Sequence, residues 1–319
     1  MVAAWGVWGL LWAPALAEAP RPLPSGFPNR TIRFITWSSP GGGGDVLGRQ
    51  MIEAIRRQNL LPVPVVIENR AGGSGAVAMA HVLQQPADGY TVLIVTKNLT
   101  LTPITRKLNY DYRSFKPIQR SQVEPFFVAV RANAPWKNLR ELADEARRGR
   151  VTFGGAFAGS TDHLLFAMFA REAGFTLTYV PFQSGGEAST ALVSGTVDVI
   201  STSPQEVAAL LDAGRVRFLA VPSEKRLPAY PDLPTFREQG YDVVMEQWRG
   251  FVYHKEVPDE IVAYMDDVLR RASRDPGFQK YMQENDLVDG YLSSSQFYQL
   301  LARETELHRE LLVATGVLR

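Results

Sequence analysis

The 319-residue chain contains no cysteine and only four histidines, and its formal net charge is +1. The absence of cysteine excludes thiol nucleophiles, disulfides, cysteine-bound zinc or iron–sulfur centres and an N-terminal lipidated cysteine. The histidines stand far apart in the sequence and offer little for a metal site, so we expect neither a metal nor a cofactor. A charge this close to zero argues against a nucleic-acid-binding protein, which carries a basic excess.

Long hydrophobic runs are absent except at the beginning of the chain. Residues 2–16 are almost wholly apolar and end in Ala15-Leu16-Ala17, the small-x-small pattern of a secretory signal peptide, although no lysine or arginine precedes the run. The run is short for a membrane span, which needs about 20 residues. We expect a signal peptide over 1–17, a proline-rich linker over 18–27 and a periplasmic, soluble protein; an uncleaved anchor or a buried N-terminal helix remains open.

Catalytic motifs are scarce as well. The G-x-S-x-G pattern of an α/β hydrolase does not occur around Ser160, because the second glycine is missing. Ser160, Asp162 and His163 are neighbours on one predicted helical turn, and such neighbours rarely point at one another as a triad requires. We therefore expect no enzyme and no catalytic residues; a secreted α/β hydrolase using Ser160 and His163 is the remaining enzymatic alternative.

The hydrophobic share of 45% is enough for a sizeable core, and strands alternate with helices along the chain. A β-branched and aromatic strand over 32–37 runs into a glycine loop and a helix, for which Asp45 is the expected N-cap. A second strand over 151–153 also runs into a glycine loop and a helix. This pattern predicts an α/β fold with two units, largely parallel sheets, and a mainly helical tail from Pro258.

The two glycine loops are the strongest candidates for a binding site. Each loop brings backbone N–H groups to the start of a helix, where they have no intrahelical partner and the helix dipole favours an anion. No Lys-Ser/Thr follows the first loop, and Val46 breaks the G-x-G-x-x-G register, so neither nucleotide-binding motif fits. His163 lies in the first turn of the second helix, where the dipole favours a neutral imidazole. Together the loops predict a cleft that holds one small anion from both sides.

Several sequence blocks resemble the Bug family, periplasmic solute-binding proteins that serve as receptors of tripartite tricarboxylate transporters. In chain order these blocks are residues 32–45, Glu68-Asn69-Arg70-Ala71-Gly72-Gly73-Ser74-Gly75, Pro86-Ala87-Asp88-Gly89-Tyr90-Thr91, Gly159-Ser160 with His163-Leu164, residues 184–198, residues 219–235 and Trp248-Arg249-Gly250. The resemblance extends from about residue 28 to the C-terminus.

The resemblance implies a two-lobed periplasmic-binding-protein fold of α/β class, a Venus flytrap of type II-like form with C-terminal helices. Lobe 1 is expected over 28–127 plus 247–319 and lobe 2 over 128–246. It also implies a site for a small carboxylate, held by amides, hydroxyls and bridging waters. The positions that carry over are Ser39, Pro40, Gly41, Gly42, Gly43, Gly44, Asp45, Gly155, Gly159, Ser160, Thr161 and His163, and more weakly Thr96, Asn98, Ser184, Gly185 and Ser203.

The sequence departs from the family pattern inside both loops. Gly44 stands where the family usually has threonine, and Gly155 stands where it usually has serine. Trp37 and Ser38 replace the more usual proline and apolar residue. For Asp45 we expect a structural role as a helix cap, because its charge would repel a carboxylate.

These observations predict a monomeric periplasmic protein that captures a small organic carboxylate, a di- or tricarboxylate or a related acid. Its implied partners are the membrane subunits of a tripartite tricarboxylate transporter, and nucleic acid is not among them. The alternative is a receptor of the same shape that reports ligand occupancy to a sensor protein.

Overall fold

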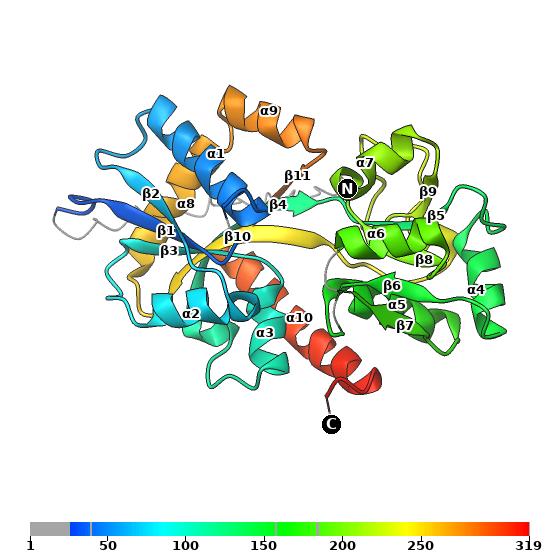
Figure 1. Cartoon of the computed structure of the whole chain (residues 1–319). Coiled ribbons are helices and arrows are strands. Elements are labelled where there is room, and N and C mark those ends of the chain that lie inside the picture. Colours follow the sequence, from blue (N-terminus) through cyan, green and yellow to red (C-terminus); the bar gives the residue numbers. More distant parts are fainter. Residues whose placement is uncertain (1–25, 39, 157, 183–184, 319) are drawn as a thin grey trace, which may run out of the picture.

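The computed structural model describes residues 26–38, 40–156, 158–182 and 185–318 and shows two bodies, each built around one sheet (Figure 1). The first sheet has the strand order β11-β4-β10-β3-β1-β2, and the second has the order β7-β6-β8-β5-β9. The strands of the first sheet are β1 (Ile32–Thr36), β2 (Val65–Asn69), β3 (Thr91–Val95), β4 (Phe115–Glu124), β10 (Gln247–His254) and β11 (Val288–Ser293). Those of the second are β5 (Phe127–Arg131), β6 (Phe153–Gly155), β7 (Tyr179–Pro181), β8 (Val199–Thr202) and β9 (Val216–Ala220).

Helices cover both sheets. Those beside the first sheet are α1 (Gly43–Arg57), α2 (Ala76–Leu83), α3 (Asn98–Thr105), α8 (Asp259–Ala272), α9 (Pro276–Glu284) and α10 (Ser294–Ala314). Those beside the second are α4 (Leu139–Arg147), α5 (Thr161–Ala173), α6 (Gly185–Ser194) and α7 (Pro204–Asp212). In α1 the apolar residues Leu47, Met51 and Ile55, spaced by four, all lie on the buried face, as their spacing predicts. In the part of the chain that the structure describes, no helix is long and apolar enough to span a membrane.

The prediction of largely parallel sheets is wrong, because both sheets are mixed. β1 pairs in parallel with β2 and β3, whereas β10 is antiparallel to β3 and β4. In the second sheet β6 is parallel to β7 and β8, but β5 is antiparallel to β8 and β9. The antiparallel strands are mainly those through which the chain passes between the sheets. β4 leads directly into β5, and the segment after β9 returns to the first sheet as β10.

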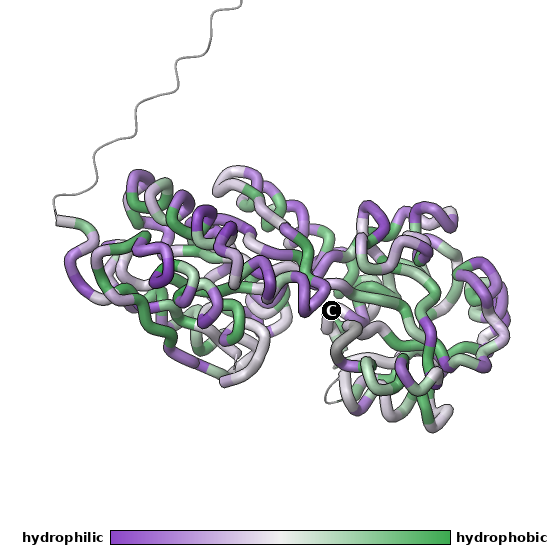
Figure 2. Tube along the Cα trace, turned by 90° about the horizontal axis from the view of Figure 1, so that it is seen from above, coloured by the Kyte–Doolittle hydropathy of each residue, from purple (hydrophilic) through white to green (hydrophobic). Residues whose placement is uncertain are grey.

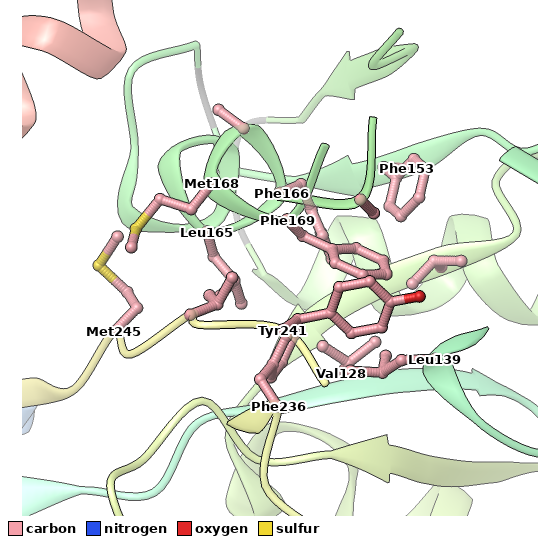
Figure 3. Packing of buried hydrophobic residues seen from close by; sticks show 14 of the residues in the cluster. Val128, Leu139, Phe153, Leu165, Phe166, Met168, Phe169, Phe236, Tyr241 and Met245 are labelled. Carbon is pink, nitrogen blue, oxygen red and sulfur yellow. The ribbon is translucent and has the colours of Figure 1, made fainter. Parts of the chain in front are cut away.

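The core of the second body is rich in aromatic residues. Phe169 of α5 makes edge-to-face contacts with Phe236 and Tyr241 at centroid distances of 5.4 Å and 5.0 Å. Figure 3 shows these side chains pointing toward one another. Such pairs stabilise a core by about 0.5–1.5 kcal/mol beyond the area that they bury.

The C-terminal helix connects the two bodies. Leu311 and Leu312 of α10 are buried in the same apolar cluster as Leu165 and Phe166 of α5. In Figure 1 the end of α10, drawn in red, reaches beneath the second body, and Figure 2 shows that the bodies meet over a narrow waist. The bodies are thus joined by two chain crossings and by this shared cluster.

Candidate functional site

The first glycine loop follows β1, and α1 begins earlier than the sequence indicates. The N-cap is Gly42, and Gly43 is the first helical residue. The expectation that Asp45 is the N-cap is therefore wrong. The last two glycines of the run, Gly43 and Gly44, are already helical, which places Asp45 in the first turn of the helix.

Asp45 instead closes the loop from inside the helix. Its carboxylate accepts hydrogen bonds from the Gly41 amide, Arg49 Nε and Asn69 Nδ2, each at 2.9 Å. The Arg49 guanidinium, followed by the Gly41 and Asn69 donors, lowers the pKa of Asp45 to about 2, against the opposing effect of burial. Asp45 is only 1% exposed, and its hydrogen bonds hold the loop against α1 without capping the helix.

Two adjacent backbone N–H groups of the first loop have no hydrogen-bond partner among the described residues. Among the described residues, nothing accepts from the amides of Gly42 and Gly43, whereas the Gly44 amide donates to Ser38 Oγ at 3.1 Å. Pro40 and Gly41 are exposed beside them, and Gly41 has a φ of +82° that favours glycine. Ser39 lies outside the described residues. Two unpaired amides at a helix start provide the anion-binding geometry that the sequence predicts.

The replacement at position 44 has a counterpart at position 38. A Cβ on Gly44 would lie 2.6 Å from Ser38 Oγ and 2.6 Å from Thr36 Oγ1. The hydroxyl that the family usually carries at position 44 is thus absent, but the hydroxyl of Ser38 fills the space next to it. Ser38 is 7% exposed. The loop keeps a hydroxyl in this space, and the hydroxyl comes from the end of β1 instead of from α1.

One charged residue reaches the first loop from a distant part of the chain. Arg249 of β10 lies so close to the start of α1 that a Cβ on Gly43 would be 2.2 Å from its Nη2. The same Nη2 donates to both carboxylate oxygens of Glu124, at 2.9 Å and 2.7 Å. Arg249 belongs to the block Trp248-Arg249-Gly250 that resembles the family, but its sequence context does not predict a place in the binding site.

The second glycine loop connects β6 to α5, and Ser160 is the N-cap of α5. Ser160 Oγ accepts from the backbone amide of His163 at 3.3 Å. Gly159, with a φ of +81°, donates its amide to His163 Nδ1 at 3.0 Å. The imidazole therefore accepts through Nδ1, and burial lowers its pKa, in agreement with the neutral form expected. The amides of Ser160, the N-cap, and of Thr161, the first helical residue, have no partner among the described residues.

Beneath this loop lies a carboxyl group with an unusual pKa. Asp162 accepts from the Ala156 amide at 2.7 Å and from Ser201 Oγ at 2.8 Å. Burial is the main cause that raises its pKa to about 6, with a smaller contribution from the negative charge of Glu206; the two hydrogen bonds act in the opposite direction. The second loop is thus held by Asp162, as the first is held by Asp45, but in a less polar environment.

The replacement at position 155 also has a counterpart. A Cβ on Gly155 would lie 2.6 Å from the hydroxyl of Tyr179 and 2.5 Å from Asp162 Cβ. The Tyr179 hydroxyl donates to the Ala156 carbonyl at 2.6 Å, and its ring stacks on His163 at a centroid distance of 4.3 Å. As in the first loop, a hydroxyl from a neighbouring strand fills the space beside the glycine.

The weaker candidates divide between the two bodies. Thr96 and Asn98 follow β3 and line a small pocket together with Trp37 and Gly75, next to the first loop. Gly185 begins α6, where a Cβ would lie 2.8 Å from a carboxylate oxygen of Glu206. Ser203 is the N-cap of α7, and Ser184 lies outside the described residues.

Other kinds of site find no support in the part of the chain that the structure describes. No group of three or more acidic or histidine side chains there could hold a metal ion. The hydroxyl of Ser160 has no hydrogen bond to the His163 ring, whose Nδ1 already accepts from Gly159. A larger cavity of about 720 Å³ lies between the end of α3 and α10, and none of the residues that line it belongs to either glycine loop.

No hydrogen bond joins the described residues of the two loops, and the hydrogen bonds that each loop makes stay within its own body. The loops correspond in construction. Each follows a strand, precedes a helix, contains an internal carboxylate that accepts a loop amide, and leaves free amides at the helix start.

Comparison with known proteins shows one consistent likeness. A family model described as a tripartite tricarboxylate transporter family receptor matches residues 47–317. The fold is similar to that of a ligand-free TctC solute binding protein from Polaromonas, with a TM-score of 0.82 and 29% identity over 90% of this chain and 99% of that one. It is also similar to R. palustris Rpa4515 with adipate, with a TM-score of 0.73 and 25% identity over 91% of this chain and 98% of that one.

A relative in sequence is protein BugT of Bordetella pertussis, 27% identical over 253 residues, which are 77% of this chain and 77% of BugT. Together with the two mixed sheets, these likenesses confirm the α/β fold of two-lobed periplasmic-binding-protein type.

Proposed function

Because this chain belongs to the tripartite tricarboxylate transporter receptor family, which includes the Bug proteins, we propose that it captures a small organic carboxylate for such a transporter. The family consists of solute-binding proteins, not enzymes. The ligand is a di- or tricarboxylate or a related acid, bound between the two bodies.

The observation that carries the proposal is the pair of glycine loops with free amides at helix starts. Gly42 and Gly43 in the first loop and Ser160 and Thr161 in the second offer neutral donors, each beside the positive end of a helix dipole. Such donors satisfy a carboxylate without a large excess of positive charge, which agrees with the net charge of +1. The adipate bound to Rpa4515 makes a linear dicarboxylate the first ligand to test.

Binding is proposed to close the two lobes, residues 28–127 plus 247–319 and residues 128–246, around the ligand. A ligand that contacts both loops stabilises the closed arrangement by its differential affinity for that state. The receptor is proposed to act as a monomer in the periplasm and to deliver the ligand to the membrane subunits of the transporter.

The proposal is tested by a thermal-shift screen of succinate, malate, adipate and citrate against neutral sugars and amines. At a ligand concentration of 100 times Kd, a bound carboxylate adds about 2.7 kcal/mol to the free energy of unfolding and raises the melting temperature. Isothermal titration calorimetry then gives the affinity. Stabilisation by sugars or amines, with none by any carboxylate, would contradict the proposal.

A further inference from the structure

Arg249 and Glu124 form an ion pair at the ends of β10 and β4, where the chain crosses between the two bodies. Arg249 lies near the beginning of β10, and Glu124 is the last residue of β4. Both hydrogen bonds of this pair use Nη2 of Arg249, and the side chains are 12% and 29% exposed. The Nε group of Arg249 is buried, and no described residue accepts a hydrogen bond from it.

The guanidinium lies against the first turn of α1. A Cβ on Gly43 would be 2.6 Å from Arg249 Cζ and 2.2 Å from Nη2, so any other residue at position 43 would force this side chain to move. A cation at this end of a helix is electrostatically unfavourable, because the N-terminus already carries a partial positive charge. Glu124 compensates only part of this local positive charge.

An arginine held beside two unpaired amides is an arrangement that suits a second anion. A guanidinium binds carboxylates through a planar fork of donors, and such charge-assisted bonds are stronger than bonds between neutral groups. The bonds to Glu124 occupy Nη2, and among the described residues nothing accepts from Nη1.

We propose that Arg249 is the charged residue of the ligand site, binding an anionic group of the ligand beside Gly42 and Gly43 in competition with Glu124. The inference rests on the proposed function and adds a specificity-determining residue to it. Glu124 holds the guanidinium in place before binding and shares or yields it when the ligand carboxylate arrives.

A second ion pair between the same segments provides a matched control. Arg120 of β4 donates through Nη1 to Glu246, which precedes β10, at 3.1 Å, and its side chain is 13% exposed. Its Nε bonds to the Gly290 carbonyl at 2.6 Å. Arg120 thus links the two crossing segments as Arg249 does, but it makes no hydrogen bond or ion pair with the described residues of the first loop.

The test compares the affinity for adipate of the wild type, Arg249→Gln, Arg249→Lys, Glu124→Gln and Arg120→Gln by calorimetry; succinate or citrate replaces adipate if the wild type binds it more tightly. The inference predicts opposite effects for the two halves of the pair. Arg249→Gln weakens binding at least tenfold and Arg249→Lys weakens it less, because the charge remains but the fork is lost. Glu124→Gln tightens binding about threefold or more, because the competing anion is gone. Circular dichroism and thermal unfolding confirm that each variant is folded.

A purely structural pair would behave differently, because either substitution breaks it. Equal shifts in the same direction for Arg249→Gln and Glu124→Gln, or an effect of Arg249→Gln no larger than that of Arg120→Gln, would overturn the inference while leaving the proposed function intact. A wild type that binds no carboxylate would overturn both.

Discussion

At the scale of single residues, two carboxyl groups hold the two glycine loops, but their environments give them opposite pKa shifts. Asp45 has charged and amide donors around it, chiefly Arg49, and its pKa falls to about 2. Asp162 has one amide and one hydroxyl donor, and burial raises its pKa to about 6. The first carboxylate is therefore charged throughout the neutral range, whereas the second takes up a proton under mildly acidic conditions.

The pKa of Asp162 predicts how stability depends on pH. Because the pKa of Asp162 in the folded protein lies above its ordinary value of 3.8, the folded protein binds the proton more tightly, and the free energy of unfolding falls as pH rises from about 4 to about 6. The full shift corresponds to roughly 3 kcal/mol, and we expect about 1–2 kcal/mol after partial solvent screening. Asp162→Asn should not lose this stability as the pH rises, because its side chain carries no charge. The asparagine side chain can still form hydrogen bonds with the backbone N–H of Ala156 and with Ser201.

The measurement is urea unfolding of wild type and Asp162→Asn at pH 4.5 and pH 7.5. The variant should gain stability relative to wild type at the higher pH. The control is Asp144→Asn on α4, whose side chain is 55% exposed. If Asp162→Asn shows the same pH dependence as wild type and the control, the buried carboxyl does not titrate as described.

At the scale of elements, each glycine loop joins the end of a strand to the start of a helix. In both loops the hydroxyl of one residue occupies the space beside a glycine. In the first loop, Ser38, two residues after the end of β1, and Gly44 in the first turn of α1 are complementary, because the hydroxyl of Ser38 occupies the space that a side chain at position 44 would need. The second loop shows the same relation between Tyr179 of β7 and Gly155 of β6. In each loop a glycine thus stands beside a hydroxyl that occupies the space of its missing side chain.

This pairing predicts the outcome of restoring the family residue. Gly44→Thr places a Cβ within 2.6 Å of two hydroxyl oxygens, so it should lower the free energy of unfolding by about 1–3 kcal/mol and weaken carboxylate binding. Adding Ser38→Ala removes one of the two close contacts and should recover a substantial part of both losses. Chemical unfolding and calorimetry of both single variants and the double variant measure the coupling. Additive losses would show that the two positions do not interact.

The sequence predicts these elements well where local patterns determine them, and poorly where tertiary contacts do. Helix α2 (Ala76–Leu83) begins and ends where its pattern indicates, after a glycine turn. Strand β4 is not predicted, because Pro117 and the buried polar residues Gln119 and Gln122 obscure the alternation expected of a strand. The position of Arg249 against Gly43 could not be predicted either. The two residues are far apart in the sequence and meet only because β10 returns from the second body to the edge where α1 begins.

At the scale of the whole molecule, α10 packs against both bodies. Leu312 is fully buried in the apolar cluster of the second body, and its Cδ2 would lie 3.2 Å from a Cβ on Gly159 of the second loop. Closer to its centre, α10 is tied to the first body, where Glu304 pairs with the buried Lys97 and accepts from Trp248 Nε1. The same helix therefore packs against one body and supports the ligand loop of the other.

We expect Leu312→Ala to lower the free energy of unfolding by about 2–4 kcal/mol, as substitutions that leave a cavity in a core do. Its neighbour Val313 is 57% exposed, so Val313→Ala should change stability by less than about 0.5 kcal/mol and serves as the matched control. Because Leu312 lies beside Gly159, Leu312→Ala should also bind the carboxylate more weakly at temperatures where the variant is still folded. Val313→Ala should bind it as the wild type does. Urea unfolding followed by tryptophan fluorescence measures the stability, and calorimetry at 15 °C measures the binding. Equal stabilities of the two variants would mean that α10 does not join the bodies. A large loss of stability with unchanged affinity would mean that it joins them without supporting the second loop.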